Sequence, residues 1–411
     1  MKAHRRFTAR FSHALVLGAA LLTGSPALAA DYVFSDLGGL SNPSNVYNPV
    51  AINNLGHVLG FNADQNYAVW RNDSWSDLPV LPGSGYGYWA AWDMNDSGQV
   101  AGLGVHTAGN AAVAMRWDSP TSQPIPLTGL IPYDPTQSLL PSDHGYAINN
   151  LGAVAGSVWR PSGGSSPGLW QPGSTTVTDL GHLGGQETFV GSNSINDVGT
   201  VAGTGMTENG EAWRAAAWVN GGAPELLALL PGGGLNSEAS AINNLGQIVG
   251  AANNGVSDEN GDVNVPVLWN SVAAQPTLLG TLGGTRGLAI SINDNGQIVG
   301  LSETADGKVR PTLWDNGQLI DLTQFIPADL LAAGWNNEGD DPASASSFLT
   351  GGSSIFINNQ GVIVTTLYNG DNSTPWMLTP NPVPVPAAVY LFGTGLVGLV
   401  GLARRRMKAT D

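Results

Sequence analysis

The sequence predicts an all-β fold, a seven-bladed β-propeller, and three observations lead to that prediction. One seven-residue phrase occurs seven times, two further markers recur in step with it, and the ends of the repeat region are complementary half-units. The phrase returns about every 50 residues, which suits the four-stranded blades of propellers. Few windows show a 3.6-residue apolar period, so helices should be almost absent.

The phrase first appears as Ile52-Asn53-Asn54-Leu55-Gly56-His57-Val58. Its Asn and Asp residues suit a tight turn, and its Gly can take the positive φ that closes a hairpin. A second Gly follows four residues later in six copies, where a small residue permits close backbone approach, and Thr365 replaces it in the seventh. The first Asn of each copy is Asn53, Asn95, Asn149, Asn196, Asn243, Asn293 and Asn358.

Two other markers keep the same period, always in the order Leu, phrase, Trp. The Trp markers are Trp70, Trp117, Trp170, Trp218, Trp269, Trp314 and Trp376. The Leu markers are Leu37, Leu78, Leu127, Leu180, Leu227, Leu279 and Leu322. Asn-Gly pairs at 220–221 and 316–317 separate a Trp from the next Leu, and this dipeptide is a strong hairpin signal. The Trp strand and the following Leu strand should therefore be hairpin partners.

The two ends of the repeat region decide the topology. Leu37 has no Trp before it, and Trp376 has no Leu strand after it. In a closed ring the strand from Tyr32 to Leu37 would pair with the strand that carries Trp376, and residues 31–378 would form the propeller. An open β-solenoid is the rival, and it would need capping ends instead. The stretch Thr323 to Phe348 is an insertion, with a short helix expected over Pro327 to Ala333.

Residues 1–30 have the pattern of a signal peptide. A positive n-region precedes an apolar run that is too short to span a bilayer, and a small-x-small pattern follows. Cleavage is expected near Ala29 or Ala30. The alternative, a membrane anchor, is disfavoured by the short apolar run.

The C-terminus has three parts. Residues 379–386 form a Pro-rich linker, residues 387–403 are uncharged and just long enough for one transmembrane helix, and residues 404–411 are a basic tail. Arg404, Arg405 and Arg406 should stay on the cytoplasmic side, because such clusters resist translocation. The body would then be exported and held for a time at the inner membrane.

This tail resembles the PEP-CTERM sorting signal, in its Val-Pro-Leu-Pro-Ala variant. The resemblance rests on Val383, Pro384 and Pro386, then the Gly-rich span, then the Arg cluster; Val385 stands where the variant has Leu. It implies a membrane-embedded exosortase as partner, cleavage near the Pro motif, and delivery to the cell surface or extracellular matrix of a Gram-negative-type bacterium. An ordinary tail anchor is the alternative.

The repeats resemble extracellular HAF repeats. The resemblance is carried by Asp179-Leu180-Gly181-His182-Leu183-Gly184-Gly185, followed by Ser194-Ile195-Asn196-Asp197-Val198-Gly199. It covers most of residues 31–378. The family implies no settled activity, so it identifies the module without a function.

Composition excludes several classes of function. Of 15 Lys and Arg, four lie before residue 31 and four after residue 403, so seven remain against 30 of the 31 acidic residues, a net charge near −23. Such a surface repels nucleic acid phosphates. The chain has no Cys, which excludes thiol catalysis and thiolate metal sites.

Candidate chemical motifs are weak. Gly164 to Gly168 matches Gly-x-Ser-x-Gly, but Pro167 lacks the N–H that an oxyanion hole needs, so a loop is predicted. Alternating oxygen ligands at Asp258, Asn260 and Asp262 suggest calcium, although the closing Glu is missing and a solvated hairpin tip is the alternative. The aromatic run Tyr86 to Trp92 suits sugar stacking or blade core.

No catalytic motif survives, and no cofactor is expected. The sequence therefore favours a non-enzymatic binding or structural propeller of the exopolysaccharide or biofilm matrix, with exopolysaccharide or matrix proteins as partners. The alternative is a secreted glycoside hydrolase or polysaccharide lyase, which would need two carboxylates from different blades at one pole of the channel.

Overall fold

A computed structural model describes the chain between residues 31 and 381, except for residues 39, 41–47, 63, 65, 82–84, 108–110, 132–140, 260, 339–354 and 371. The predicted signal peptide, the transmembrane helix, the basic tail and the processing residues therefore lie outside the described residues. None of the helices that are described is long and apolar enough to cross a membrane.

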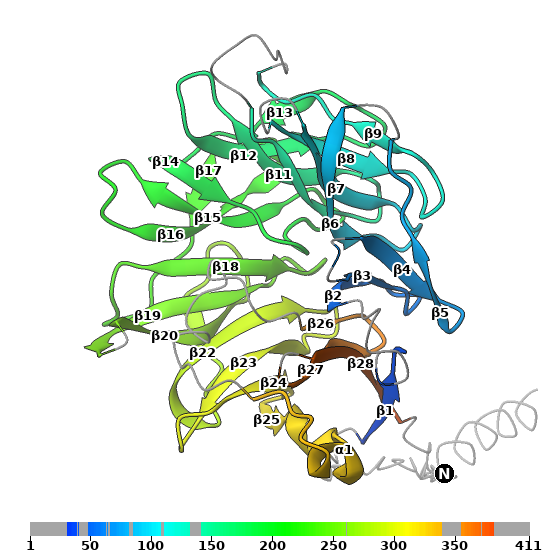
Figure 1. Cartoon of the computed structure of the whole chain (residues 1–411). Helices are drawn as coiled ribbons and strands as arrows, with labels where there is room; N and C mark the ends of the chain where they lie inside the picture. The colour runs from blue at the N-terminus through cyan, green and yellow to red at the C-terminus, as the bar shows by residue number, and fades with distance from the viewer. Residues whose placement is uncertain are drawn as a thin grey trace, which may run out of the picture.

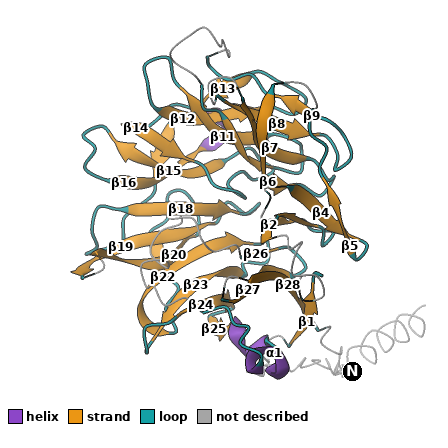
Figure 2. Ribbon diagram, in the orientation of Figure 1, coloured by secondary structure: helices purple, strands orange, loops and turns teal. Residues whose placement is uncertain are grey.

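The described strands form seven antiparallel four-stranded sheets, arranged as blades around a central axis (Figures 1 and 2). Blade 1 contains β2 (Asn48–Ile52), β3 (Val58–Phe61), β4 (Tyr67–Arg71) and β5 (Ser74–Asp77). Blade 2 contains β6 (Tyr86–Met94), β7 (Val100–His106), β8 (Ala112–Trp117) and β9 (Pro124–Pro126). Blade 3 contains β10 (His144–Ile148), β11 (Val154–Trp159), β12 (Ser165–Trp170) and β13 (Val177–Asp179).

The remaining blades repeat this pattern from the axis outward. Blade 4 contains β14 (Gly184–Phe189), β15 (Val201–Thr207), β16 (Trp213–Trp218) and β17 (Pro224–Leu226). Blade 5 contains β18 (Ser237–Ile242), β19 (Ile248–Asp258), β20 (Gly261–Trp269) and β21 (Pro276–Leu278). Blade 6 contains β22 (Gly283–Ile292), β23 (Ile298–Thr304), β24 (Val309–Asp315) and β25 (Gln318–Asp321). Blade 7 contains β26 (Phe356–Ile357), β27 (Ile363–Asn369), β28 (Asn372–Pro380) and, from the other end of the chain, β1 (Tyr32–Asp36).

Blade 7 confirms the predicted ring closure. Strand β1 pairs antiparallel with β28 along its full length, from Tyr32 opposite Pro380 to Asp36 opposite Trp376. The ring of Phe34 also stacks on Trp376, with centroids 5.4 Å apart. Each half-unit therefore completes the other, and an open array is excluded.

The Gly residues of the phrase act as the sequence predicted. The first Gly of every copy has a φ between 76° and 86°, a conformation in which Gly is favoured. The second Gly lies against a neighbouring carbonyl; a Cβ on Gly250 would stand 1.9 Å from the Glu238 oxygen. Five inner strands carry a β-bulge beside this contact: β2, β6, β10, β18 and β22.

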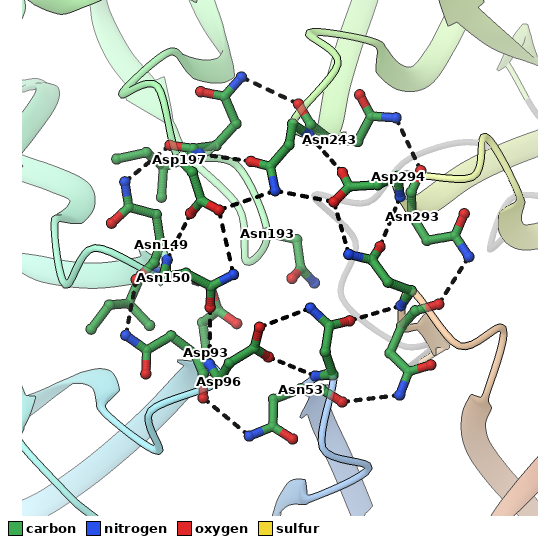
Figure 3. Close-up of a pocket in the computed structure, with 18 of the residues that line it drawn as sticks. Asn53, Asp93, Asp96, Asn149, Asn150, Asn193, Asp197, Asn243, Asn293 and Asp294 are labelled. Atoms are coloured by element: carbon green, nitrogen blue, oxygen red, sulfur yellow. Dashed lines mark hydrogen bonds between the residues drawn. The ribbon is translucent and has the colours of Figure 1, made fainter. Parts of the chain in front are cut away.

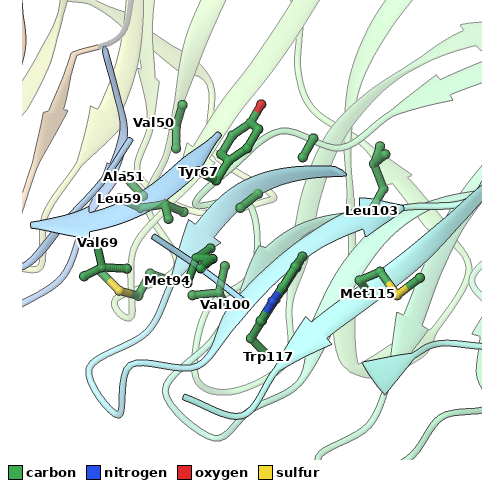
Figure 4. Close-up of a cluster of buried hydrophobic side chains, with 13 residues drawn as sticks. Val50, Ala51, Leu59, Tyr67, Val69, Met94, Val100, Leu103, Met115 and Trp117 are labelled. Carbon is green, nitrogen blue, oxygen red and sulfur yellow. The ribbon is translucent and has the colours of Figure 1, made fainter. Parts of the chain in front are cut away.

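The Trp markers join neighbouring blades. Trp117, Trp170, Trp218, Trp269 and Trp376 are fully buried. The Nε1 of Trp117 donates to the Pro79 carbonyl at 2.8 Å, and the residue after a Leu marker accepts in the same way from Trp170, Trp218, Trp269 and Trp314. Apolar clusters fill the space between blades; one of them, between blades 1 and 2, surrounds Trp117 (Figure 4).

The insertion has the predicted short helix, α1 (Ala328–Ala332), which follows the 3-10 helix η2 (Leu322–Phe325). A second 3-10 turn, η1 (Val219–Gly221), lies at the Asn-Gly hairpin of blade 4. The prediction of a loop over Gly164 to Gly168 was wrong, because Ser165 begins strand β12. Burial overrides the turn chemistry there: Ser166 is fully buried, and its Oγ donates to the Asp179 carboxylate at 2.7 Å.

Candidate functional site in the central channel

The inner strands surround a cavity of about 110 Å³ at one mouth of the channel (Figure 3). All seven copies of the phrase contribute to its lining through the Ile or Met, the first Asn, and the Asn or Asp that follows. Asp93 and Asn193 are its two irregular members. The repeated phrase, which sequence reasoning treated as a turn signal, thus also forms the wall of the channel.

The first Asn of each phrase forms a closed inner ring. These side chains are only 3–5% exposed. Each Nδ2 donates to the backbone carbonyl of the corresponding Asn in the next blade at 2.9–3.2 Å, and Asn358 closes the ring by donating to Asn53. Each Oδ1 meanwhile accepts from its own turn, as Asn53 does from the N–H groups of Leu55 and His57. One amide therefore shapes the turn and joins two blades.

The next residue of each phrase forms an outer ring. Its backbone N–H donates to the side-chain Oδ1 of its counterpart in the next blade at 2.7–3.0 Å, again around the full circle. This geometry requires a side-chain oxygen, which Asn and Asp both supply. The members are Asn54, Asp96, Asn150, Asp197, Asn244, Asp294 and Asn359.

The two rings explain why the phrase repeats. Each neutral hydrogen bond contributes on the order of 1 kcal/mol, whereas a buried donor or acceptor left without a partner costs more. Losing one Asn would thus weaken both a turn and an interface between blades. Closure of the ring is sufficient to account for the phrase, without any catalytic role.

Asp93 is the main departure from the repeat. The corresponding positions of the other blades hold uncharged residues: Ala51, Ala147, Ser194, Ala241, Ser291 and Phe356. Asp93 is 3% exposed, and its carboxylate accepts from the N–H groups of Met94 at 2.8 Å and Ile148 at 2.9 Å. Burial raises its pKa to about 6, against the lowering effect of these donors and of the Asn193 backbone.

Asn193 is the second departure, and it meets Asp93 from blade 4. Its φ is 57°, a left-handed conformation that Asn tolerates better than most residues. Regular strand β14 ends at Phe189, before this position, and the Asn193 carbonyl accepts from the Ile242 N–H at 3.0 Å. Its carboxamide lies towards the middle of the cavity (Figure 3). Asp93 could have been singled out in the sequence, because it is the only charged residue at its position of the repeat. The contact between Asp93 and Asn193 of blade 4 could not be predicted from the sequence.

Blade 3 carries another polar cluster on its inner strand. The Nε2 of His144 lies 3.2 Å from the Ser142 Oγ, while its Nδ1 contacts the Tyr146 hydroxyl. Burial lowers the pKa of His144 to about 4, so this imidazole is a weak base. The neighbouring Asp143 carboxylate accepts instead from the Trp159 N–H at 2.8 Å. A serine, a histidine and an orienting carboxylate therefore do not align as nucleophilic catalysis requires.

The predicted calcium ligands have other contacts. Asp258 pairs with the Arg286 guanidinium, and Asp262 accepts from the Ser257 Oγ at 2.8 Å. Asn260 lies outside the described residues. In the part of the chain that the structure describes, no group of three or more His, Asp or Glu residues is placed to hold a metal. Calcium binding stays a prediction.

The aromatic run of β6 belongs largely to the core of blades 1 and 2. Ala90 and Ala91 are buried, and the Trp89 ring meets Trp117 edge-on at 6.3 Å. Tyr88 is more open, with 38% of its surface exposed. Of the two interpretations of this run, the structure favours blade core for most of its residues.

No family model and no curated protein matches the chain. Solved structures give distant likenesses. A putative TolB from Agrobacterium tumefaciens is 11% identical, with a TM-score of 0.39, over 68% of this chain and 80% of its own. A Mycobacterium tuberculosis puromycin-hydrolyzing peptidase is 12% identical, with a TM-score of 0.49, over 86% of this chain and 55% of its own. A GH74 xyloglucanase from Xanthomonas campestris is 9% identical, with a TM-score of 0.45, over 82% of this chain and 52% of its own. This chain spans about half the length of the last two proteins.

Proposed function

We propose that this chain is an exported, non-enzymatic propeller that an exosortase sorts to the cell surface or extracellular matrix, where it binds exopolysaccharide or matrix proteins. The observation that carries the proposal is the use of the channel's polar groups. The Asn and Asp side chains of both rings are engaged in bonds between blades, so their recurrence is a property of the scaffold. The surface, with its net charge near −23, suits a soluble life outside the cell.

The sorting part of the proposal rests on the terminal signals. The closed ring uses residues from Tyr32 to Pro380, so it lies wholly between the expected cleavage at Ala29 or Ala30 and the Pro motif at Val383. Both cuts would leave strands β1 and β28 intact. Replacing Pro384 and Pro386 with Ala should keep the chain in the membrane fraction, and immunoblots of membrane and released fractions would measure this. Equal release of the variant and the wild type would count against sorting.

The binding part is tested with the full chain, purified in mild detergent. Co-sedimentation with the exopolysaccharide and protein fractions of its own matrix should show saturable binding to at least one of them. No binding to either fraction would remove the proposal.

Polysaccharide hydrolysis is a second candidate, and Asp93 favours it. A buried carboxyl with a raised pKa is a frequent property of a general acid. Release of new reducing ends from matrix glycans by the wild type, and not by Asp93→Asn, would replace the binding proposal with this one. We expect no release from either.

A further inference from the structure

Four aliphatic side chains project beside the acidic channel mouth. They occupy one position of the turn, directly after the outer ring: Leu55, Leu151, Val198 and Leu245 are 65%, 64%, 66% and 67% exposed. Three of them lie on the consecutive blades 3, 4 and 5, and we call Leu151, Val198 and Leu245 the apolar arc. Large exposed apolar residues that gather in one place mark interaction surfaces, whereas scattered ones do not.

The fold does not require these apolar side chains. The same turn position holds Ser97 in blade 2, Asn295 in blade 6 and Gln360 in blade 7. Those turns keep the same backbone bond between the first Asn and the Gly three residues on, at 2.9–3.1 Å. The turn depends on its Asn and Gly, so the apolar arc needs an explanation outside the fold.

The mouth inside the arc is acidic. Asp96, Asp197 and Asp294 belong to the outer ring and accept from neutral amides of adjoining blades, for example Asp197 from Asn150 and Asn244. No Lys, Arg or His is among the described residues that line the cavity. A positively charged group is thus the electrostatic complement of this mouth.

The chemistry of the channel mouth favours a protein ligand over a saccharide or a membrane. A cavity of about 110 Å³ has space for the end of one side chain. The arc contains aliphatic residues, whereas a saccharide site would favour aromatic platforms. An anionic membrane surface would be repelled by the three carboxylates.

We propose that the channel mouth docks a protein that presents a Lys or Arg flanked by apolar side chains. The basic side chain enters the cavity towards Asp96, Asp197 and Asp294, and the flanking residues rest on the apolar arc. The inference rests on the proposed role as a binding propeller and specifies one surface for it. The proposed function and this inference can be tested separately, because the chain can still bind its matrix through another face when the channel mouth is altered.

The probe is a random nonapeptide display library, selected on the immobilised full chain. Selected peptides should be enriched in a central Lys or Arg with Leu, Ile, Val or Phe beside it. Asp197→Asn with Asp294→Asn should weaken a selected peptide at least tenfold. Asn occupies the same ring position in four other blades, so the Oδ1 that accepts from the backbone N–H of the preceding blade survives. The charge is lost, together with the Oδ2 that accepts from the side chains of Asn244 and Asn359.

A second variant tests the apolar part independently. Leu151→Ser, Val198→Ser and Leu245→Ser together should also weaken binding at least tenfold, and Ser97 shows that the turn accepts Ser. The matched control is Leu226→Ser with Leu278→Ser, which removes two exposed Leu side chains from the outermost strands β17 and β21. The control should bind like the wild type, and thermal melts confirm that each variant is folded.

Three results would overturn the inference. One is a selection that yields no basic consensus, and another is peptide binding that survives both mouth variants. The third is arc-dependent binding of the chain to phosphatidylglycerol–phosphatidylethanolamine vesicles in place of peptides, which would assign the arc to a membrane.

Discussion

At the residue scale, Asp93 combines structural and electrostatic consequences in one side chain. It accepts from backbone groups of blades 2 and 3 and from the Asn193 backbone of blade 4. Desolvation raises the pKa of a buried carboxyl, and hydrogen bonds from N–H donors lower it. For Asp93 desolvation is the larger effect, so its pKa rises to about 6.

This shift predicts a pH dependence of stability. Between pH 4 and 6 the folded protein keeps a proton on Asp93 that the unfolded chain has released, so the contribution of Asp93 falls as pH rises. From pH 5 to pH 7 the wild type should lose about 1 kcal/mol that Asp93→Asn does not lose. Urea unfolding of both proteins at the two pH values measures the difference. Parallel pH profiles would contradict this assignment.

Residues that recur in every blade could be predicted from the sequence, whereas the contacts of residues that depart from the repeat could not. The seven Asn positions and the Gly with positive φ could be read from spacing and turn chemistry, because their neighbours are local. Asp93 was visible as an odd residue, but its partners Ile148 and Asn193 lie far away in the chain. A contact between blades has no local signature.

The inner ring gives a second prediction at this scale. Asn243→Ala removes the acceptor for the Leu245 and Gln247 N–H groups and the donor to the Asn293 carbonyl. Buried groups left without partners should cost about 2–4 kcal/mol in unfolding free energy. Gln360→Ala, at an exposed turn position, is the control and should stay within about 0.5 kcal/mol. If both variants melt alike, the ring is not important for stability.

At the element scale, the bulged inner strand and the Gly opposite it form one unit. The close approach of Gly250 to the Glu238 carbonyl leaves no space for a Cβ. The same approach recurs in blades 2, 3 and 6, at Gly102, Gly156 and Gly300, with distances of 1.8–2.0 Å from the built Cβ to a carbonyl oxygen. The sequence predicted this closeness from the recurrence of Gly, although the bulge itself could not be predicted.

Gly250→Ala tests this unit. The two strands would have to separate, which should cost at least about 3 kcal/mol by disrupting paired backbone and core packing. Gly307→Ala is the matched control, because Gly307 has a φ of 81° but open space around it, and it should cost about 1–2 kcal/mol. Chemical denaturation of both variants gives the comparison. Equal losses would show that close approach to the neighbouring carbonyl does not explain the second Gly of the repeat, because Gly250 has no positive φ.

Two elements differ from the regular pattern for identifiable reasons. Strand β12 was predicted as a loop because Ser, Gly and Pro are turn residues, but pairing with β11 and β13 on either side determines its structure. Trp376 is the only fully buried Trp marker whose Nε1 has no partner among the described residues. The Thr323 carbonyl, at the position of the usual acceptor, instead accepts from the Ile326 N–H where the insertion begins.

At the scale of the whole molecule, the seven blades are held together without disulfide bonds, because the chain has no Cys. The channel along the axis is lined by polar side chains as well as apolar ones. Apolar clusters fill the interfaces between blades, and two rings of hydrogen bonds surround the channel. Both termini of the folded body meet in blade 7, where β1 lies outside β28. The number of blades and the closing strand followed from the sequence, since complementary half-units leave one topology. The channel cavity and its acidic mouth did not, because they arise only when seven turns converge.

The propeller is closed by the pairing of β1 with β28, and an engineered disulfide between these two strands measures that pairing. The chain has no Cys, so Ser35→Cys with Met377→Cys introduces the sole pair, at positions directly opposite in the two strands. Under mild oxidation this pair should cross-link within one chain, seen as a faster band on a non-reducing gel, and should raise the melting temperature. Val33→Cys with Met377→Cys is two positions out of register and should cross-link far less. Failure of the first pair, or equal cross-linking of the second, would contradict the closed ring.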